Sequence, residues 1–254
     1  MSIEILPANF LAVPPALSMK RFSAGKIPCA LKFQNKLQSR FVTQLKFGRN
    51  MNVEIFAVNI AAQLNRSVDA WLKYFSSERC EKILSYRFNA DRNRTVWAEL
   101  LVRNVVAEKF SCPLEKIQIH RDATGKPHVA ELPVEISLSH SGNWVVCSVG
   151  EIKSGVDVEV DSADAAGIAK RFFLPSEYEK IISLPKNLRE RQFLIYWTLK
   201  ESYFKLTGAK SFLHADCEKI LAGNGKVIGK NFFLNDGAVV GICVYEVDQR
   251  RDEE

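Results

Sequence analysis

Long apolar runs and paired cysteine motifs are both missing from this 254-residue sequence. No apolar run approaches the ~20 residues that cross a membrane, so we expect no membrane partner. The six cysteines form no C-x-x-C pair and have no histidine at ligand spacing. Most of them lie in apolar runs, which predicts buried free thiols in a reducing compartment and therefore a cytoplasmic protein.

The net charge of +6 is concentrated in one part of the chain. Residues 1–50 contain eight Lys or Arg and a single acidic residue, Glu4, whereas the rest contains 27 basic and 28 acidic residues. Because the body of the protein is close to neutral, its charge gives no reason to expect a nucleic-acid partner.

The first fifty residues are predicted to be a disordered extension. They are basic and contain Pro7, Pro14, Pro15 and Pro28. The apolar piece that begins at Phe10 follows no basic segment, so a secretory signal is not expected, while an organelle transit peptide remains compatible with the composition. A strand pattern starts directly after Met51, and an alternative is that residues 1–50 are upstream sequence before a start at Met51.

Strand and helix patterns alternate in two similar halves, 51–150 and 151–254. In the first half we expect strands at 53–60, 135–140 and 144–149, helices starting at Ser67 and Ser76, and a long helix at 90–110. In the second half we expect strands at 155–160, 215–222, 226–235 and 238–247, and helices from Ser162, from Pro175 and over 188–206.

Internal similarity supports this division. Segments 77–85 and 176–183 resemble each other, and Trp97 and Trp197 occupy matching places in the two long helices. We therefore predict an α+β fold of two α/β halves related by pseudo-twofold symmetry, with the site in the crevice between them.

Two carboxylates share one face of a predicted strand in Gly155-Val-Asp-Val-Glu-Val160. Side chains at i and i+2 of a strand point the same way, so Asp157 and Glu159 project together. Carboxylates this close repel unless a cation or a proton lies between them, which favours a Mg²⁺ site. The alternative is the solvent face of an edge strand.

A second acidic position lies in Trp197-Thr-Leu-Lys-Glu-Ser-Tyr-Phe-Lys205. On a helix, Glu201 and Lys205 are i,i+4 neighbours and could offer a metal ligand with an ammonium group one turn away. Taken alone, the pair is equally typical of a surface salt bridge.

Leu138-Ser-His-Ser-Gly142 ends a predicted strand in a tight turn. Its histidine and hydroxyls, beside backbone N–H groups, could bind an anion such as phosphate, although a structural turn histidine is as compatible with the pattern. Ser139 and Ser141 point away from His140 on a strand, so no Ser-His-Asp triad is predicted. The segment Thr124-Gly-Lys-Pro127 predicts a turn that exposes the ammonium group of Lys126.

Four motifs follow one another in the sequence: G-K-P, S-H-S-G, G-V-D-V-E and W-x-x-K-E-S-x-x-K. In their order and spacing they resemble those of the 4′-phosphopantetheinyl transferases of the surfactin-synthetase-activating type. The resemblance covers about residues 52–247. It implies transfer of the phosphopantetheine arm of coenzyme A, with Mg²⁺, to a serine of an apo acyl or peptidyl carrier protein. It also implies two pseudosymmetric halves in one chain, and hence a monomer.

The resemblance implies roles for individual residues. Asp157, Glu159 and Glu201 would hold Mg²⁺, and Lys205 would contact the pyrophosphate. The remaining positions would bind coenzyme A: Arg79, Lys82 and His140 at the 3′-phosphate, Thr95 at the nucleotide, Gly125, Lys126 and Pro127 near the adenine, and Ser139 beside His140. Arg79 stands where the family more often has lysine.

The carrier serine must lose a proton, which calls for a base. Glu177, Glu201 and a metal-bound water are the candidates, and a carboxylate on a metal is the weaker base, which favours Glu177 or the water. Two other functions remain open from the residues alone. Spaced acids with a lysine also suit a Mg²⁺-dependent nuclease, and a duplicated fold without chemistry could be a carrier-protein binding module.

Overall fold

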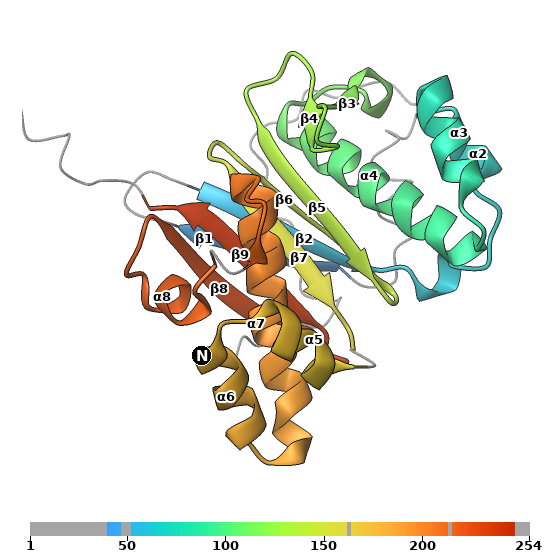
Figure 1. The fold of residues 1–254 in the computed structure, drawn as a ribbon. Helices are drawn as coiled ribbons and strands as arrows, with labels where there is room; N and C mark the ends of the chain where they lie inside the picture. Colours follow the sequence, from blue (N-terminus) through green and yellow to red (C-terminus); the bar gives the residue numbers. More distant parts are fainter. Residues whose placement is uncertain (1–39, 47–51, 162–163, 213–214, 247–254) are drawn as a thin grey trace, which may run out of the picture.

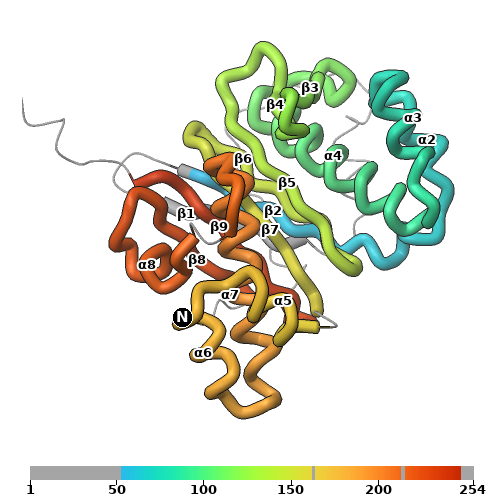
Figure 2. Tube along the Cα trace, in the orientation of Figure 1, coloured from blue at the N-terminus to red at the C-terminus, as the bar shows by residue number. Residues whose placement is uncertain are grey.

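The computed structural model describes residues 40–46, 52–161, 164–212 and 215–246. Two antiparallel sheets lie at the centre of a mixed α+β fold, and each has a long helix packed on one face (Figure 1). The chain completes the first sheet and its helix before it starts the second, as the colours in Figure 2 show.

The first half is built around a four-stranded sheet. Its strand order is β1 (Arg40–Lys46), β2 (Asn52–Asn59), β6 (Trp144–Gly150), β5 (Glu135–Ser141). The 21-residue helix α4 (Asn89–Lys109) packs on it. The smaller elements are η1 (Ala61–Gln63), α2 (Asp69–Leu72), α3 (Ser77–Ser85), η2 (Leu114–Lys116), and the ribbon of β3 (Ile119–Arg121) and β4 (Pro127–Val129).

The second half is built around a three-stranded sheet. Its order is β7 (Ser154–Glu159), β9 (Val239–Tyr245), β8 (Val227–Phe233). Helices α7 (Lys186–Thr207) and α8 (Cys217–Ala222) pack on this sheet, and α5 (Ala165–Phe172) and α6 (Pro175–Ser183) pack against α7.

The two sheets share an apolar core. On β2, Phe56 and Val58 pack in the cluster that contains α4, whereas Val53 and Ile55 pack against Val156 and its neighbours in the second sheet. This period of two is what a strand buried on both faces requires. Each such side chain contributes about 1.5–3 kcal/mol when buried, so the two halves stabilise each other.

Most predicted elements are confirmed within a few residues, but one is wrong. Residues 217–222 form helix α8, not a strand. The Asp216 side chain accepts a hydrogen bond of 3.2 Å from the Lys219 backbone N–H, which caps the helix. Cys217 and Ile220 face the core from one side of α8, and such a short apolar run reads equally well as a strand.

The boundary of the predicted extension also needs correction. Residues 40–46 form β1 and pair antiparallel with β2 from Arg40–Val58 to Lys46–Asn52, so this piece belongs to the first sheet. The rest of the predicted extension, and the predicted helix start at Ser162, lie outside the described residues. The described helices include none that is long and apolar enough to cross a membrane.

Candidate functional site

Asp157 on β7 and Lys205 on α7 form the centre of the candidate site. Asp157 is 3% exposed, and its Oδ1 accepts hydrogen bonds from Lys205 Nζ at 2.7 Å and from Ser139 Oγ at 2.7 Å. Lys205 Nζ also donates to the Val156 carbonyl oxygen at 3.1 Å. The strand that carries the predicted carboxylates and the helix that carries Lys205 are therefore in contact in the structure.

A row of serines on β5 joins the first sheet to β7. Ser137 Oγ accepts from the Val156 backbone N–H at 3.1 Å, and Ser141 Oγ donates to Glu159 Oε2 at 2.7 Å. With Ser139, these alternate positions lie on one face of the strand. The carboxylates of one half thus receive hydrogen bonds from the other half, and the site lies at the junction.

Two glycines bring α7 close to the second sheet. A Cβ on Gly155 would overlap the carbonyl oxygen of Ser202, and one on Gly241 would lie 2.7 Å from the carbonyl oxygen of Thr198. Ser202 Oγ also donates to the Gly241 carbonyl oxygen at 2.9 Å. The helix backbone rests directly on β7 and β9, and this contact sets how far Lys205 reaches over β7.

Negative charge is in excess around Asp157. Burial, then the charge of Asp157, raises the pKa of Glu159 to about 7, and the same two causes raise the pKa of Glu201. Asp157 Oδ2 is buried and has no hydrogen-bond partner among the described residues. A buried acceptor without a donor is costly, so this oxygen marks a place for a cation or a ligand donor.

The carboxylates suit a hard cation in chemical type. The described residues contain no cluster of three or more His, Cys, Asp or Glu side chains that is already gathered as a metal site. Mg²⁺ commonly binds through one or two carboxylates, with water and substrate phosphate as its other ligands. The orphaned Asp157 Oδ2 beside Glu159 therefore fits such an ion without a preformed three-residue cage.

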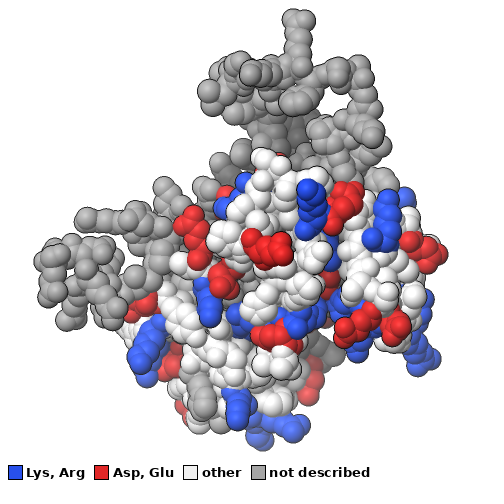
Figure 3. Space-filling view, turned by 90° about the horizontal axis from the view of Figure 1, so that it is seen from above, with Lys and Arg blue, Asp and Glu red and all other residues white. Residues whose placement is uncertain are grey.

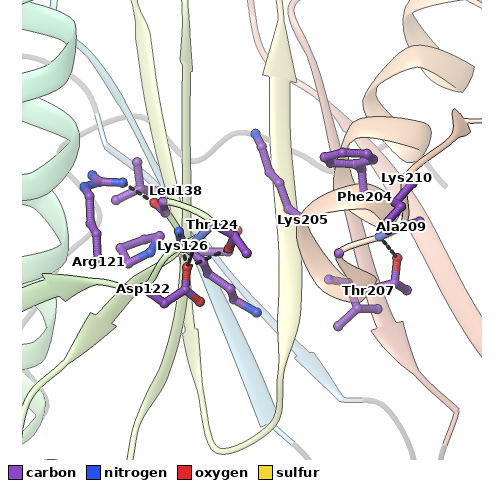
Figure 4. A pocket seen from close by; sticks show the side chains of 15 residues that line it. Arg121, Asp122, Thr124, Lys126, Leu138, Phe204, Lys205, Thr207, Ala209 and Lys210 are labelled. Carbon is purple, nitrogen blue, oxygen red and sulfur yellow. Dashed lines mark hydrogen bonds between the residues drawn. The ribbon is translucent and has the colours of Figure 1, made fainter.

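A cavity of about 700 Å³ opens beside this cluster, between the two halves. Figure 4 shows the side chains of one wall, which come from the first half, facing those of the end of α7, with Lys205 between them. The first wall includes Arg121, Lys126, Pro127 and Leu138, and the second includes Phe204. Three of the labelled cations, Arg121, Lys126 and Lys205, line the same space, which suits an anionic ligand.

The predicted G-K-P turn lies in this wall and is held by Asp122. Asp122 Oδ1 accepts from the Thr124 side chain at 2.6 Å and from the Lys126 backbone N–H at 3.1 Å. The hydrogen bonds from Thr124, then that from His128, lower the pKa of Asp122 well below its usual value. Gly125 adopts φ +85°, which favours glycine at this position.

Arg79 binds a buried glutamate that was not predicted from the sequence. Glu99 is 2% exposed, and its Oε1 lies 2.6 Å from Arg79 Nη2 and 2.7 Å from Arg121 Nη2. Arg103 Nη1 lies 3.3 Å from Glu99 Oε2. Burial opposes ionisation, but the three guanidinium groups, that of Arg79 first, lower the pKa of Glu99. Arg79 is thus linked through Glu99 to Arg121 on the cavity wall.

The other predicted ligand residues differ in exposure. His140 is exposed on β5, yet packing around the ring lowers its pKa, and the charges of Lys205 and Arg94 act in the same direction. Thr95 is buried on α4. Lys82 is exposed on α3, and its Nζ lies 5.6 Å from the centroid of the Tyr86 ring.

Glu177 is separated from this group of residues by its contacts. It is 1% exposed, and its oxygens are bound by backbone N–H groups and by Lys200, in the core between α6, α7 and α8. Nothing in the sequence distinguishes a buried glutamate from an exposed one. The same holds for Lys200, which stands in the W-x-x-K-E-S-x-x-K motif without a predicted role.

The fold and the site together define a class of protein. It is an α+β protein of two sheets, with a carboxylate–lysine cluster at their junction. A cavity lined by cations lies beside the cluster and suits an anionic ligand bound between the halves. Family models extend this conclusion. Residues 64–151 match the N-terminal domain of 4′-phosphopantetheinyl transferases, and residues 153–240 match the 4′-phosphopantetheinyl transferase superfamily. The chain belongs to the 4′-phosphopantetheinyl transferase family.

Individual relatives agree with the family models. The chain is 32% identical over 161 residues to the 4′-phosphopantetheinyl transferase psf-1 of Bacillus pumilus, which covers 61% of this chain and 69% of that protein. It is 30% identical over 141 residues to the 4′-phosphopantetheinyl transferase Sfp of Bacillus subtilis, covering 55% and 63%. A mouse relative, L-aminoadipate-semialdehyde dehydrogenase-phosphopantetheinyl transferase, is 28% identical over 152 residues, covering 54% and 49%.

Proposed function

We propose that this protein transfers the 4′-phosphopantetheine arm of coenzyme A to a serine of an apo acyl or peptidyl carrier protein, in the cytoplasm and as a monomer. The observation that carries the proposal is the Asp157–Lys205 pair, which lies 2.7 Å apart beside an inter-half cavity, in a chain of this family. Holo carrier protein and adenosine 3′,5′-bisphosphate would be the products.

In this proposal, the cavity binds coenzyme A by charge. Lys126, Pro127 and Gly125 line the wall near the adenine end, and Arg79, Lys82, His140 and Thr95 serve the phosphate-bearing nucleotide. Lys205 contacts the pyrophosphate and steadies the charge that develops on the leaving group. Fixed charges of this kind stabilise a phosphoryl-transfer transition state without covalent help from the protein.

Asp157, Glu159 and Glu201 would hold Mg²⁺, with Ser139 and Ser141 orienting the first two. When bound, the ion supplies neutralisation of the pyrophosphate oxygens. Asp157 must then share its charge between Lys205 and the ion, and its second oxygen, Oδ2, is the atom available for the ion.

The proton of the carrier serine needs an acceptor near the junction. Burial and Asp157 raise the pKa of Glu201, but a Mg²⁺ ion on this carboxylate would lower its pKa and make it a weaker base. We therefore assign the proton to a water at the junction. Glu177, the other candidate, has its oxygens engaged elsewhere.

Mass spectrometry tests the proposal. The protein is incubated with coenzyme A, Mg²⁺ and a panel of apo carrier proteins, and a mass increase of one phosphopantetheine is expected on at least one of them. Asp157→Asn keeps the shape of the side chain and should abolish the increase while carrier binding persists. If the wild-type protein instead cuts DNA with Mg²⁺ and modifies no carrier, the proposal is wrong.

The charges on the face shown in Figure 3 give the nuclease alternative no support. In the view of Figure 3, Lys and Arg side chains alternate with Asp and Glu side chains over the face shown. A nuclease that follows a polyanion needs a continuous basic track, because phosphate contacts supply most of its affinity.

A further inference from the structure

Glu177 and Lys200 form an ion pair in the core of the second half. Lys200 Nζ lies 2.8 Å from Glu177 Oε2, and the two side chains are 0% and 1% exposed. Nζ also donates to the carbonyl oxygens of Ala215 at 2.6 Å and Phe212 at 3.3 Å. The ammonium thus has three acceptors, as a buried cation requires.

The carboxylate is engaged just as fully. Glu177 Oε2 also accepts from the Leu174 backbone N–H at 2.9 Å, which caps α6, and Oε1 accepts from the Cys217 backbone N–H at 2.8 Å, at the start of α8. A buried network in which each member is satisfied fixes the relative position of the segments that it joins. This network joins α6, α7, Phe212, Ala215 and α8.

The segment held in this way continues from the cavity wall. Phe204 and residues 208–210 line the cavity at the end of α7. The ring of Phe212 packs against Phe204 at 5.5 Å and against Trp197 at 5.3 Å between centroids. Any shift of Phe212 would therefore reach the wall through Phe204 and through the chain itself.

We infer that Glu177, through its buried ion pair with Lys200, is a positioning residue that holds the end of α7 and residues 208–212 in place as one wall of the coenzyme A cavity. The inference rests on the proposed function for the identity of the ligand. It gives Glu177 a role in binding instead of proton transfer, because its oxygens are bound to backbone N–H groups and Lys200.

Glu177→Gln provides the first test. The amide has one acceptor oxygen for the two backbone N–H groups and no charge for Lys200, so the wall should loosen. We expect KM for coenzyme A to rise about tenfold or more, while kcat at saturation falls no more than about threefold. Removing a general base would instead lower kcat by about 10²-fold or more and leave KM in place.

Hydrogen–deuterium exchange gives a readout that does not depend on activity. Amides of residues 208–212 and 215–217 should exchange faster in the variant, and added coenzyme A should slow them less than in the wild type. Lys180→Met is the matched control, because Lys180 also links α6 to α8, through an exposed pair with Glu218 at 2.8 Å. It should leave KM and exchange at wild-type values.

A second variant covers the case in which Glu177→Gln does not fold. Replacing both partners, as in Glu177→Leu with Lys200→Met, avoids an unpaired buried charge and often preserves stability. It should show the same rise in KM and the same faster exchange. A folded double variant with wild-type KM and exchange, or a Glu177→Gln variant that loses only kcat, would overturn the inference. If the wild-type protein modifies no carrier, the proposed function fails, but the exchange comparison still tests the positioning role.

Discussion

Lys205 Nζ lies 2.7 Å from Asp157 Oδ1, so a helix of the second half supplies the counter-charge for the most buried carboxylate at the junction. Ser139 of the first half donates to the same oxygen. The site is therefore assembled from three elements that are distant in the sequence, and each can be tested separately.

Replacing Lys205 should affect both transfer and stability. Lys205→Met keeps the length of the side chain but removes the ammonium, and we expect kcat to fall about 10²–10³-fold. Asp157 would lose its cation but keep Ser139, and because Lys205 is 29% exposed we expect a loss of only about 1–3 kcal/mol in unfolding free energy. Transfer kinetics and urea unfolding measure the two effects.

Lys219→Met is the control for that change. Lys219 is 71% exposed and pairs with Asp216 at 3.2 Å. A pair this exposed contributes little, so activity and unfolding should stay close to wild type. Equal losses in both variants would show that the Lys205 effect is not specific to the site.

The glycines beneath α7 predict a steric effect. Gly155→Ala or Gly241→Ala places a Cβ against the helix backbone at Ser202 or Thr198, so the helix must move away from the sheet. We expect each to cost about 1–3 kcal/mol or more of unfolding free energy and to lower transfer, because Glu201 and Lys205 move with the helix.

Gly225→Ala tests whether that loss is local. The nearest atom to a Cβ at Gly225 would be the Val227 carbonyl oxygen at 4.0 Å, which is ordinary contact. In thermal denaturation, the unfolding midpoint of the Gly225→Ala variant should match that of the wild type within error. A Gly241→Ala variant with full activity and an unchanged midpoint would contradict the close packing of α7.

The sequence alone predicts the parts of the site that depend on local periodicity. Alternation in β7 is enough to place Asp157 and Glu159 together, and helical spacing is enough for Glu201 and Lys205. Burial depends on contacts between distant segments, so it was not predictable that Glu177 meets Lys200 in the core, or that Glu99 gathers three arginines. The error at 217–222 has the same origin, since a short apolar run is compatible with either a helix or a strand.

The Glu99 cluster predicts a loss of stability in acid. The pKa of Glu99 is lower in the folded protein than its usual 4.5, so the unfolded state binds the proton more tightly. The stabilisation is fully present above about pH 4.5 and is lost as the pH falls through the folded pKa. Glu99→Gln should be less stable at neutral pH, and its unfolding free energy should change less steeply with pH below 4.5.

Urea unfolding between pH 3 and 7 would measure the difference in slope. Glu218→Gln is a suitable comparison, because the pKa of Glu218 is also lowered, by Lys180 and Tyr196, but on the exposed surface. Glu218→Gln should lower the free energy of unfolding less than Glu99→Gln does at every pH. Parallel curves for the wild type and Glu99→Gln in acid would show that the arginines do not hold Glu99 ionised.

Lys126 allows the nucleotide end of the cavity to be separated from the chemistry. It lines the cavity, and its backbone N–H is fixed by Asp122 at 3.1 Å, so Lys126→Met should keep the turn while removing the charge. An interaction made equally before and during transfer lowers KM without changing kcat. We therefore expect KM for coenzyme A to rise about tenfold with kcat unchanged, measured by steady-state transfer to an apo carrier protein. A fall in kcat at saturating coenzyme A would mean that Lys126, like Lys205, acts on the charge that develops at the reacting phosphate, which would contradict a role in binding alone.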